Sequence, residues 1–108
     1  MERIKPALDH IVRHYAEDIS IQELAEQCAM SVYHFCRVFK AVTGDTTISY
    51  INQLRIKNAC HLLSNTDTGV AEIAFSCGYR NLSNFNRQFR QMVNCTPGAY
   101  RRILRQAR

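Results

Sequence analysis

The 108-residue sequence predicts an all-α fold of seven helices, in which one helical unit occurs twice and a long central helix joins the two copies. Three observations support this fold class. Apolar residues recur three and four positions apart, and alternating runs of β-branched residues are absent. Residue types that start and stop helices recur along the chain. The second half also repeats the residue pattern of the first half, as a duplicated structural unit does.

Apolar spacing and terminal residues predict the first three helices. The first helix has one apolar stripe and a tolerated proline in its first turn, at Ile4, Leu8, Ile11, Val12, Tyr15 and Pro6. Ser20 followed by Glu23 forms a capping box that opens a short second helix. Ser31 is a suitable N-cap for the third helix, which we expect to stop near Gly44.

A long central helix is expected from about residue 47 to residue 63. Thr47 can cap its start, and the polar stretch 64–69 ends it. At 1.5 Å per residue, this helix would be about 26 Å long. Its apolar contacts to the two copies are expected from Ile48, Ile51, Leu54, Ala59, Leu62 and Leu63.

Three further helices complete the chain. Residues 70–76 form a short helical segment. Asn81 caps the next helix, which stops near Asn94, and the pair Thr96-Pro97 starts the last helix.

An internal repeat organises these helices. At an offset of 49 residues, Glu23-Leu24-Ala25 aligns with Glu72-Ile73-Ala74, Cys28 with Cys77 and Ala29 with Gly78. One inserted residue in the following turn raises the offset to 50. The matches are then Phe35 with Phe85, Arg37 with Arg87, Phe39 with Phe89, Lys40 with Arg90, Gly44 with Asn94, Thr46 with Thr96 and Tyr50 with Tyr100. So many ordered matches indicate one unit written twice.

Each copy has a short helix, a tight turn with a small residue and a second helix, which is the helix-turn-helix pattern; a plain helical hairpin is the simpler alternative. The expected core stripes of the second helices are Phe35, Phe39 and Val42, and Leu82, Phe85, Phe89 and Met92. The outward stripes are Tyr33, Cys36, Arg37 and Lys40, and Ser83, Asn86, Arg87 and Arg90. Neither outward stripe contains an acid, which suits a helix that enters a DNA major groove.

Basic residues are concentrated in the last third of the chain. Fourteen Lys and Arg against nine Asp and Glu give a net charge of +5, and residues 73–108 contain seven Arg and no acid. Eleven of the bases are Arg, whose planar guanidinium suits phosphate and guanine. This asymmetry indicates a polyanionic partner, although many basic proteins bind only counterions.

Cysteine usage indicates a reducing, cytoplasmic compartment. The five cysteines are odd in number and include no Cys-x-x-Cys pair, so we expect neither a disulfide framework nor a zinc cluster, and we expect most of them to be buried. His10 and His14 lie four residues apart and could hold a metal from one helix face. No third ligand accompanies them, so a solvated helix face is the favoured interpretation and no metal is expected.

Other function classes receive no support from the sequence. No apolar run is long enough to span a bilayer, and the N-terminal residues do not resemble a signal peptide, so no membrane partner is expected. The few histidines and acids show no spacing of a catalytic dyad or triad, and no glycine-rich phosphate loop is present. We therefore expect no enzymatic activity and no cofactor.

The segment from about Ile21 to Arg102 resembles the DNA-binding domain of the AraC/XylS family of bacterial transcription regulators. The most specific stretch is 70–102, where the similarity rests on Ile73-Ala74, Gly78-Tyr79, Ser83, Phe85, Arg87, Phe89, Thr96-Pro97 and Tyr100-Arg101. The resemblance implies one domain over residues 1–108, with helix-turn-helix units at about 5–45 and 68–106 and a linking helix at about 47–63. It also implies sequence-specific binding to two consecutive major grooves of double-stranded promoter DNA, usually with activation through contact with RNA polymerase.

The resemblance also implies roles for individual residues. Base contacts are expected from Tyr33, Cys36 and Arg37 in the first unit and from Ser83, Asn84, Asn86 and Arg87 in the second. Backbone contacts are expected from Ser31, Lys40, Asn81 and Arg90. Arg37 and Arg87 can each fork onto a guanine edge, with a phosphate clamp or an internal salt bridge as the alternative for Arg37. Asn86 is expected on adenine or phosphate, and Tyr33 on a thymine methyl group or phosphate.

Three positions depart from the family pattern. Cys36 stands where a larger polar residue is common, and because a thiol is a weak hydrogen-bonding group, we expect apolar contact there at most. Thr47 and Asn94 replace a common proline and a common glycine, and both suit their places as cap and helix stop.

Members of this family usually carry another domain that binds a small molecule or receives a signal. We therefore interpret the chain as the DNA-binding part of a longer regulator rather than as a stand-alone activator. A helical protein–protein module whose basic faces meet an acidic partner is the alternative function.

Overall fold

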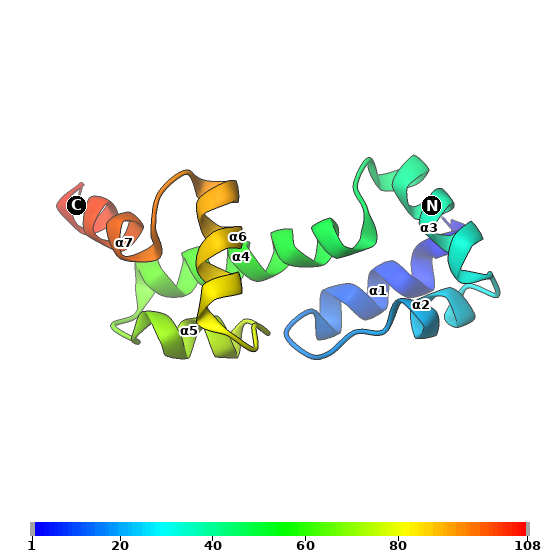
Figure 1. The fold of residues 1–108 in the computed structure, drawn as a ribbon, viewed down its shortest axis with the longest axis horizontal. Coiled ribbons are helices and arrows are strands. Elements are labelled where there is room, and N and C mark those ends of the chain that lie inside the picture. The colour runs from blue at the N-terminus through cyan, green and yellow to red at the C-terminus, as the bar shows by residue number, and fades with distance from the viewer. Residues whose placement is uncertain (1, 108) are drawn as a thin grey trace. The chain divides into compact units, whose positions relative to one another are not determined.

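The computed structural model describes residues 2–107 and confirms the predicted all-α fold, since these residues form seven α-helices, one short 3₁₀ turn and no strand (Figure 1). In order, the elements are η1 (Glu2–Ile4), α1 (Lys5–His14), α2 (Ile21–Gln27), α3 (Val32–Thr43), α4 (Thr47–Asn65), α5 (Val70–Ser76), α6 (Leu82–Val93) and α7 (Pro97–Gln106). The chain divides into two compact units between Asn52 and Gln53, inside α4. Among the described residues, no helix combines the length and apolar content that crossing a bilayer requires.

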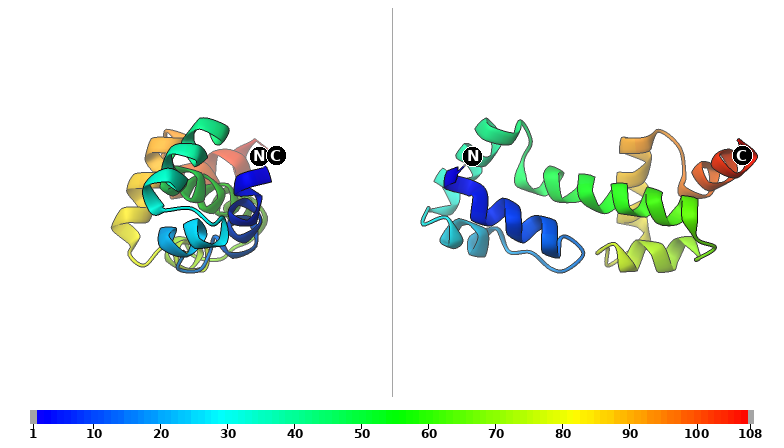
Figure 2. Two further views of the ribbon diagram at one scale, coloured as in Figure 1. Left: turned by 90° about the vertical axis from the view of Figure 1, so that its right-hand side faces the viewer. Right: turned by 180° about the vertical axis from the view of Figure 1, so that it is seen from behind.

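In the first unit, α2 packs against both α1 and α3, and η1 also contacts α3 (Figure 2). Its buried apolar residues are Ile4, Ala7, Ile11, Leu24, Ala25, Phe35, Phe39 and Ile51. Within the predicted α1 stripe, Ile4 and Ile11 are buried, but Val12 is exposed and Ala7 takes an inner position. The spacing 4, 7, 11 follows one helix face, and an alanine on that face gives little hydrophobic signal in the sequence.

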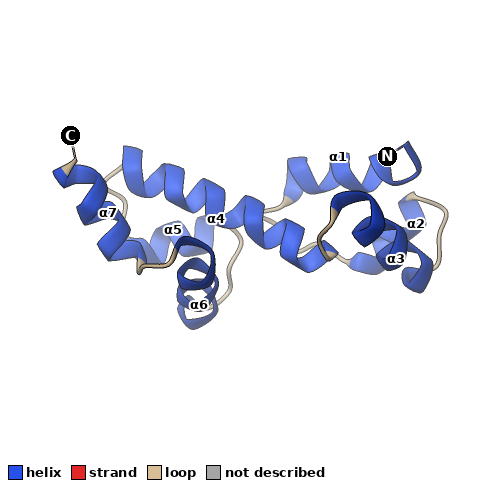
Figure 3. Cartoon of the chain, turned by 90° about the horizontal axis from the view of Figure 1, so that it is seen from above, coloured by secondary structure: helices blue, strands red, loops and turns tan. Residues whose placement is uncertain are grey.

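In the second unit, α6 packs against α5 and α7 (Figure 3). The core cluster contains Ile56, Ala59, Leu63, Ile73, Ala74, Cys77, Tyr79, Phe85 and Phe89. The Arg55 guanidinium carbon lies 5.5 Å from the ring centroid of Tyr79, within cation–π range. Arg55 thereby joins the packing of α4 against the turn after α5.

The aromatic residues of the two units repeat the same arrangement. In the first unit, ring centroids lie 5.6 Å apart for Phe35–Phe39 and 5.4 Å apart for Phe39–Tyr50. The matching distances are 5.7 Å for Phe85–Phe89 and 5.7 Å for Phe89–Tyr100. The burial classes of residues 41–50 and 91–100 also agree position by position. The structure therefore confirms the internal repeat at an offset of 50.

The tight turns of the two units share an unusual backbone conformation. Ala29 and Gly78 both have positive φ, at 56° and 109°. In each turn, the next amide donates to a carbonyl of the short helix, at 2.9 Å for Met30 and 3.1 Å for Tyr79. A left-handed residue of this kind ends a helix sharply, and only glycine adopts it without strain.

Most of the predicted helix ends are confirmed. Ser20 caps α2 through its Oγ, which accepts from the amide of Glu23. Ser31 and Asn81 cap α3 and α6 through side-chain oxygens. Gly44 and Asn94 end these helices in the left-handed region.

The predicted cap of the long helix is wrong by one residue. Thr46, not Thr47, caps α4, because Thr46 Oγ1 accepts from the Ser49 amide at 3.1 Å. The matching bond in α7 runs from the Ala99 amide to Thr96 Oγ1, also at 3.1 Å. Thr47 is the first residue of α4 and is buried, and its Oγ1 has no hydrogen-bond partner among the described residues. The helix also continues to Asn65, two residues beyond the predicted end.

The predicted core stripes were too wide. The central phenylalanines of α3 and α6 are buried, but the outer stripe residues Val42, Leu82 and Met92 are exposed. On an α-helix, a residue three positions from a core residue is rotated by about 60° around the axis. Because each unit is small, only a narrow stripe of each helix is covered. Ile48 of α4 is also exposed, whereas Ile56, absent from the prediction, is buried.

All five cysteines are free thiols. Cys77 is buried, Cys36 is exposed, and the other three are half-buried. The expectation that most of the cysteines are buried is therefore wrong.

Candidate nucleic-acid interface

The exposed face of α3 carries the side chains predicted to read bases in the first unit. Tyr33, Cys36, Arg37 and Lys40 are all exposed, and Tyr33 has 72% of its surface accessible. Arg37 Nη1 donates to the Tyr33 hydroxyl at 3.4 Å, and its guanidinium carbon lies 5.7 Å from the Tyr33 ring centroid. Because α3 contains no acid, this face presents only cationic, aromatic and thiol groups to a ligand.

The exposed face of α6 presents a different set of groups on an equivalent backbone. Ser83, Asn86, Arg87 and Arg90 are exposed, and Asn84 is half-buried. Arg87 Nη2 donates to Asn84 Oδ1 at 2.8 Å, so the Asn84 amide holds the guanidinium along the helix. This helix also contains no acid. Its exposed face is therefore hydrogen-bonding and cationic.

The N-termini of α3 and α6 are both capped by a side-chain oxygen. Ser31 Oγ accepts from the His34 amide at 3.2 Å, and Asn81 Oδ1 accepts from the Asn84 amide at 2.7 Å. These caps use the oxygen of each side chain and leave the Ser31 hydroxyl hydrogen and the Asn81 amide group as donors. Helix N-termini with such donors suit phosphate.

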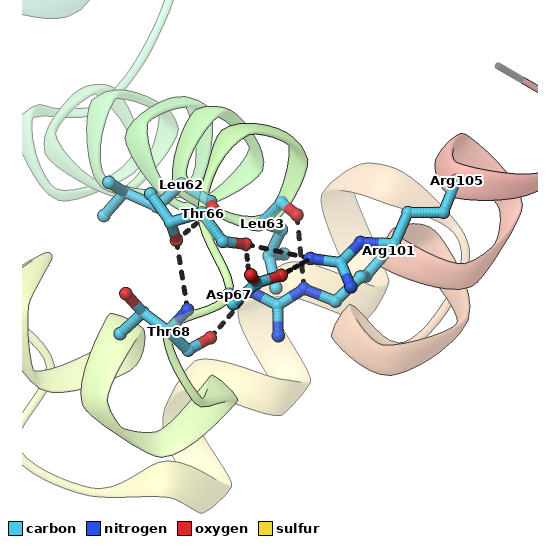
Figure 4. A network of polar contacts seen from close by, with 7 residues as sticks. All are labelled: Leu62, Leu63, Thr66, Asp67, Thr68, Arg101 and Arg105. Carbon is cyan, nitrogen blue, oxygen red and sulfur yellow. Dashed lines mark hydrogen bonds and ion pairs between the residues drawn. The ribbon is translucent and has the colours of Figure 1, made fainter.

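Two arginines of the basic last third bind the protein itself (Figure 4). Arg101 donates to the carbonyls of Leu63, Thr66 and Thr68, at 3.2, 3.1 and 2.6 Å. Arg105 donates to the Thr66 carbonyl and to Asp67 Oδ1, at 3.1 and 2.5 Å. Together they fix α7 to the loop between α4 and α5. The charge count therefore overstates the number of cations available to a polyanion.

Sequence reasoning missed a groove along α3. It has a volume of about 500 Å³ and is lined by Ile21, Tyr33, Cys36, Arg37, Lys40, Ala41, Thr46, Thr47 and Ile48. We call it the α3 groove. Ile48, at the start of α4, is 61% exposed on its wall. The internal repeat offers a signal for this groove, because the two copies differ there. Apolar Ala41 and Ile48 in the first unit match Gln91 and Gly98 in the second.

The histidine pair of α1 has partners within the protein. The rings of His10 and His14 lie 4.7 Å apart, and His14 Nδ1 is 2.6 Å from Glu17 Oε2. Within residues 2–107, no three His, Cys, Asp or Glu side chains gather in a way that could hold a metal ion.

The model of the helix-turn-helix domain family matches residues 24–103. Among curated relatives, the MmsAB operon regulatory protein of Pseudomonas aeruginosa is 36% identical over 93 residues, which cover 86% of this chain and 30% of that protein. The transcriptional activator RhaS of Salmonella arizonae is 38% identical over 95 residues, covering 88% of this chain and 33% of that protein. The chain thus spans about a third of the length of the curated relatives it matches.

Solved structures share the fold over nearly the whole chain. The DNA-binding domain of the transcriptional factor AdpA, solved in complex with a target DNA, gives a TM-score of 0.86 at 28% identity, covering 95% of this chain and 96% of that one. A probable AraC family transcriptional regulator from Rhodopseudomonas palustris gives 0.85 at 26% identity, covering 100% and 99%.

Proposed function

We propose that this chain, which belongs to the DNA-binding domains of the AraC/XylS family of helix-turn-helix transcription regulators, recognises a promoter site. In this proposal, α3 and α6 enter consecutive major grooves. Each helix would read a short block of bases from one side of the duplex. Consecutive grooves on one face are about 34 Å, or about 10 base pairs, apart.

One observation carries this proposal: two helices at equivalent positions of a duplicated unit both expose an acid-free, basic face. A solvated surface helix ordinarily mixes Glu with Lys, because mixed charges favour solubility. Exclusion of acids from both exposed faces removes repulsion against phosphate. The same exposure leaves side chains free to reach base edges.

We assign base contacts to the side chains in the middle of each face and backbone contacts to those at its ends. Arg37 and Arg87 are the main base readers, each able to donate two hydrogen bonds to a guanine edge. The other base contacts come from Tyr33, Cys36, Ser83, Asn84 and Asn86. Ser31, Lys40, Asn81 and Arg90 hold phosphates and fix the register.

The curated relatives are longer regulators, and their other parts suggest roles for a longer protein that contains this chain. The RhaS relative is named a transcriptional activator, and we propose that this chain likewise activates transcription through contact with RNA polymerase in the cytoplasm of a bacterium. A domain outside this chain would bind the effector or receive the signal. The domain itself is expected to have no catalytic activity.

Selection of bound sites from random duplex DNA at fixed salt tests the proposal. We expect two short conserved blocks about 10 base pairs apart. Arg37→Ala should blur one block and Arg87→Ala the other, each by about 1–3 kcal/mol of discrimination. Arg102→Ala, at an exposed position on α7, is the matched control and should leave both blocks intact.

Two results would contradict the proposal. A single block would mean that only one helix reads bases. Equal weakening by both variants on every sequence, with no preference among duplexes, would instead favour the basic protein–protein module. The logarithm of affinity should also fall steeply with the logarithm of salt concentration, since several phosphates are neutralised.

A further inference from the structure

The two reading faces share a backbone but differ in chemistry. At an offset of 50, the residues Tyr33, Cys36, Ala41 and Ile48 of the first unit match Ser83, Asn86, Gln91 and Gly98 of the second. In each pair, the residue of the first unit is apolar or aromatic, and its counterpart in the second unit is polar or is a glycine without a side chain. The arginines 37 and 87 and the cations 40 and 90 are matched. These four differences therefore flank the shared charges, with two before Arg37 and two after Lys40.

In the first unit, these apolar positions form one continuous surface. Tyr33, Cys36, Ala41 and Ile48 all line the α3 groove, as does Ile21 from α2. Tyr33 and Ile48 are both more than half exposed. A ligand that supplies apolar contact would gain free energy by removing this exposed apolar surface from solvent.

The charges around the groove define what can lie on it. Among the described residues that line it, Arg37 and Lys40 are the charged ones. Arg37 is held over the Tyr33 ring by the contact described above. A partner must therefore bring negative charge close to an apolar group. A DNA major groove does so, because thymine presents its 5-methyl group there between two phosphate backbones.

The size of the groove fits a short run of bases. Its α3 residues extend from Tyr33 to Ala41, which is about 12 Å at 1.5 Å per residue. Base pairs follow one another at about 3.4 Å, so the surface can face about three base steps.

We infer that the first unit reads thymine 5-methyl groups through the α3 groove, whereas the second unit reads hydrogen-bonding groups. This inference rests on the proposed function. It assigns Tyr33, Cys36 and Ile48 as the residues that specify thymine, and it leaves Arg37 to a neighbouring guanine. The operator half bound by α3 is therefore expected to be rich in thymine.

The test replaces single thymines by deoxyuridine in the selected site, which removes the methyl group and keeps every hydrogen bond. The half bound by the first unit is the one blurred by Arg37→Ala. Deoxyuridine there should weaken binding about three- to tenfold per methyl group, in line with the burial of one apolar carbon. Deoxyuridine in the half bound by the second unit should change affinity less than twofold.

A matched variant separates groove contact from other effects. Tyr33→Ser with Cys36→Asn and Ile48→Gly installs the residues of the second unit at exposed positions, and a thermal melt checks that the fold is kept. This variant should lose the sensitivity to deoxyuridine. Retained sensitivity, equal sensitivity in both halves, or indifference of the wild type to deoxyuridine would overturn the inference and leave the proposed function standing. Failure to select any preferred sequence would overturn both.

Discussion

The two units share one helical plan and use it differently. In the plan, two phenylalanines and a tyrosine stack in the same order, and a left-handed residue ends the reading helix. Residues 1–52 carry five bases and seven acids, whereas residues 53–108 carry nine bases and two acids. The comparison teaches that the two units share the aromatic positions of the core and the helix stops, while they differ in net charge and in most of the exposed side chains between the shared cations and around them.

The units also differ in how they are closed beside the aromatic stack. Arg101 of α7 donates hydrogen bonds to the end of α4 and to the loop after it. Its counterpart in the first unit is Ile51, a buried apolar residue that cannot donate such bonds from its side chain. Tyr79 packs edge-on against Phe85 at 5.4 Å and under Arg55, whereas Met30 occupies the matching place in the first unit. The second unit therefore depends more on polar and aromatic contacts.

The largest effect is expected from removing the central ring of either unit. Phe39→Ala and Phe89→Ala each delete a fully buried side chain and should lower the free energy of unfolding by about 3–5 kcal/mol. Hydrogen exchange, followed residue by residue, should show faster exchange mainly in the unit that carries the change. Val42→Ala and Met92→Ala, at exposed matching positions, are the controls and should cost under about 1 kcal/mol.

Alkaline pH should weaken the second unit in particular. Burial raises the pKa of Tyr79 to about 12, against 10 for an exposed tyrosine, although nearby Arg55 opposes the shift. Burial also raises the pKa of Cys60, Cys77 and Tyr100 in the same unit. Between pH 10 and 12 the unfolded chain therefore loses a Tyr79 proton that the folded chain keeps, so stability falls as pH rises.

The fall attributable to Tyr79 is about 2–3 kcal/mol across that pH range. Urea unfolding at pH 9 and pH 12 measures it, and Tyr79→Phe should show a smaller fall than the wild type. An equal fall in both proteins would mean that Tyr79 does not couple to folding.

A smaller effect is expected at Arg101, whose counterpart in the first unit is Ile51. Arg101→Ala removes three hydrogen bonds to carbonyls, of which the Thr66 carbonyl keeps a second donor in Arg105, and should cost about 2 kcal/mol. Arg101→Lys should restore part of this loss, because an ammonium keeps the charge but not the planar fork. Urea titration measures the free energy of unfolding of both variants against Arg102→Ala. If Arg101→Ala loses no more stability than that control, the Arg101 hydrogen bonds do not stabilise the second unit.

The smallest effect concerns the two tight turns. Ala29→Gly should stabilise the first unit by about 0.5–1 kcal/mol, because glycine adopts the positive φ of 56° without strain. Gly78→Ala should destabilise the second unit by about 1 kcal/mol or more, since its φ is 109°. Melting temperatures of the pair check the signs, and shifts in the same direction would contradict the shared turn geometry.

Repetition made most of this fold predictable from the sequence. The helices, the caps at Ser31 and Asn81 and the helix stops at Gly44 and Asn94 follow from local chemistry, which the duplicated pattern states twice. Thr47 was mistaken for a cap because threonines occupy both 46 and 47, although the counterpart pair Thr96-Pro97 distinguishes the two. The prediction that Val42 and Met92 are buried was wrong. Helical periodicity shows which face of a helix points to the core, but it does not show how much of that face the neighbouring helices cover.

The candidate site was partly predictable for a related reason. An acid-free stripe can be found from helical spacing, and its exposure follows once the opposite stripe is known to be core. The α3 groove brings together α2, α3 and the start of α4, and no pattern within one helix reveals it. Arg101 likewise looks like any other base until its carbonyl partners are in place.

Transplanting one reading face onto the other tests the central claim most directly. The changes Tyr33→Ser, His34→Asn, Cys36→Asn and Lys40→Arg give α3 the side chains of α6 at equivalent positions. If the two units read DNA independently through equivalent helices, site selection with this variant should return two copies of the block now bound by α6. Retention of the original first block, or loss of both blocks in a protein that still folds, would contradict the account.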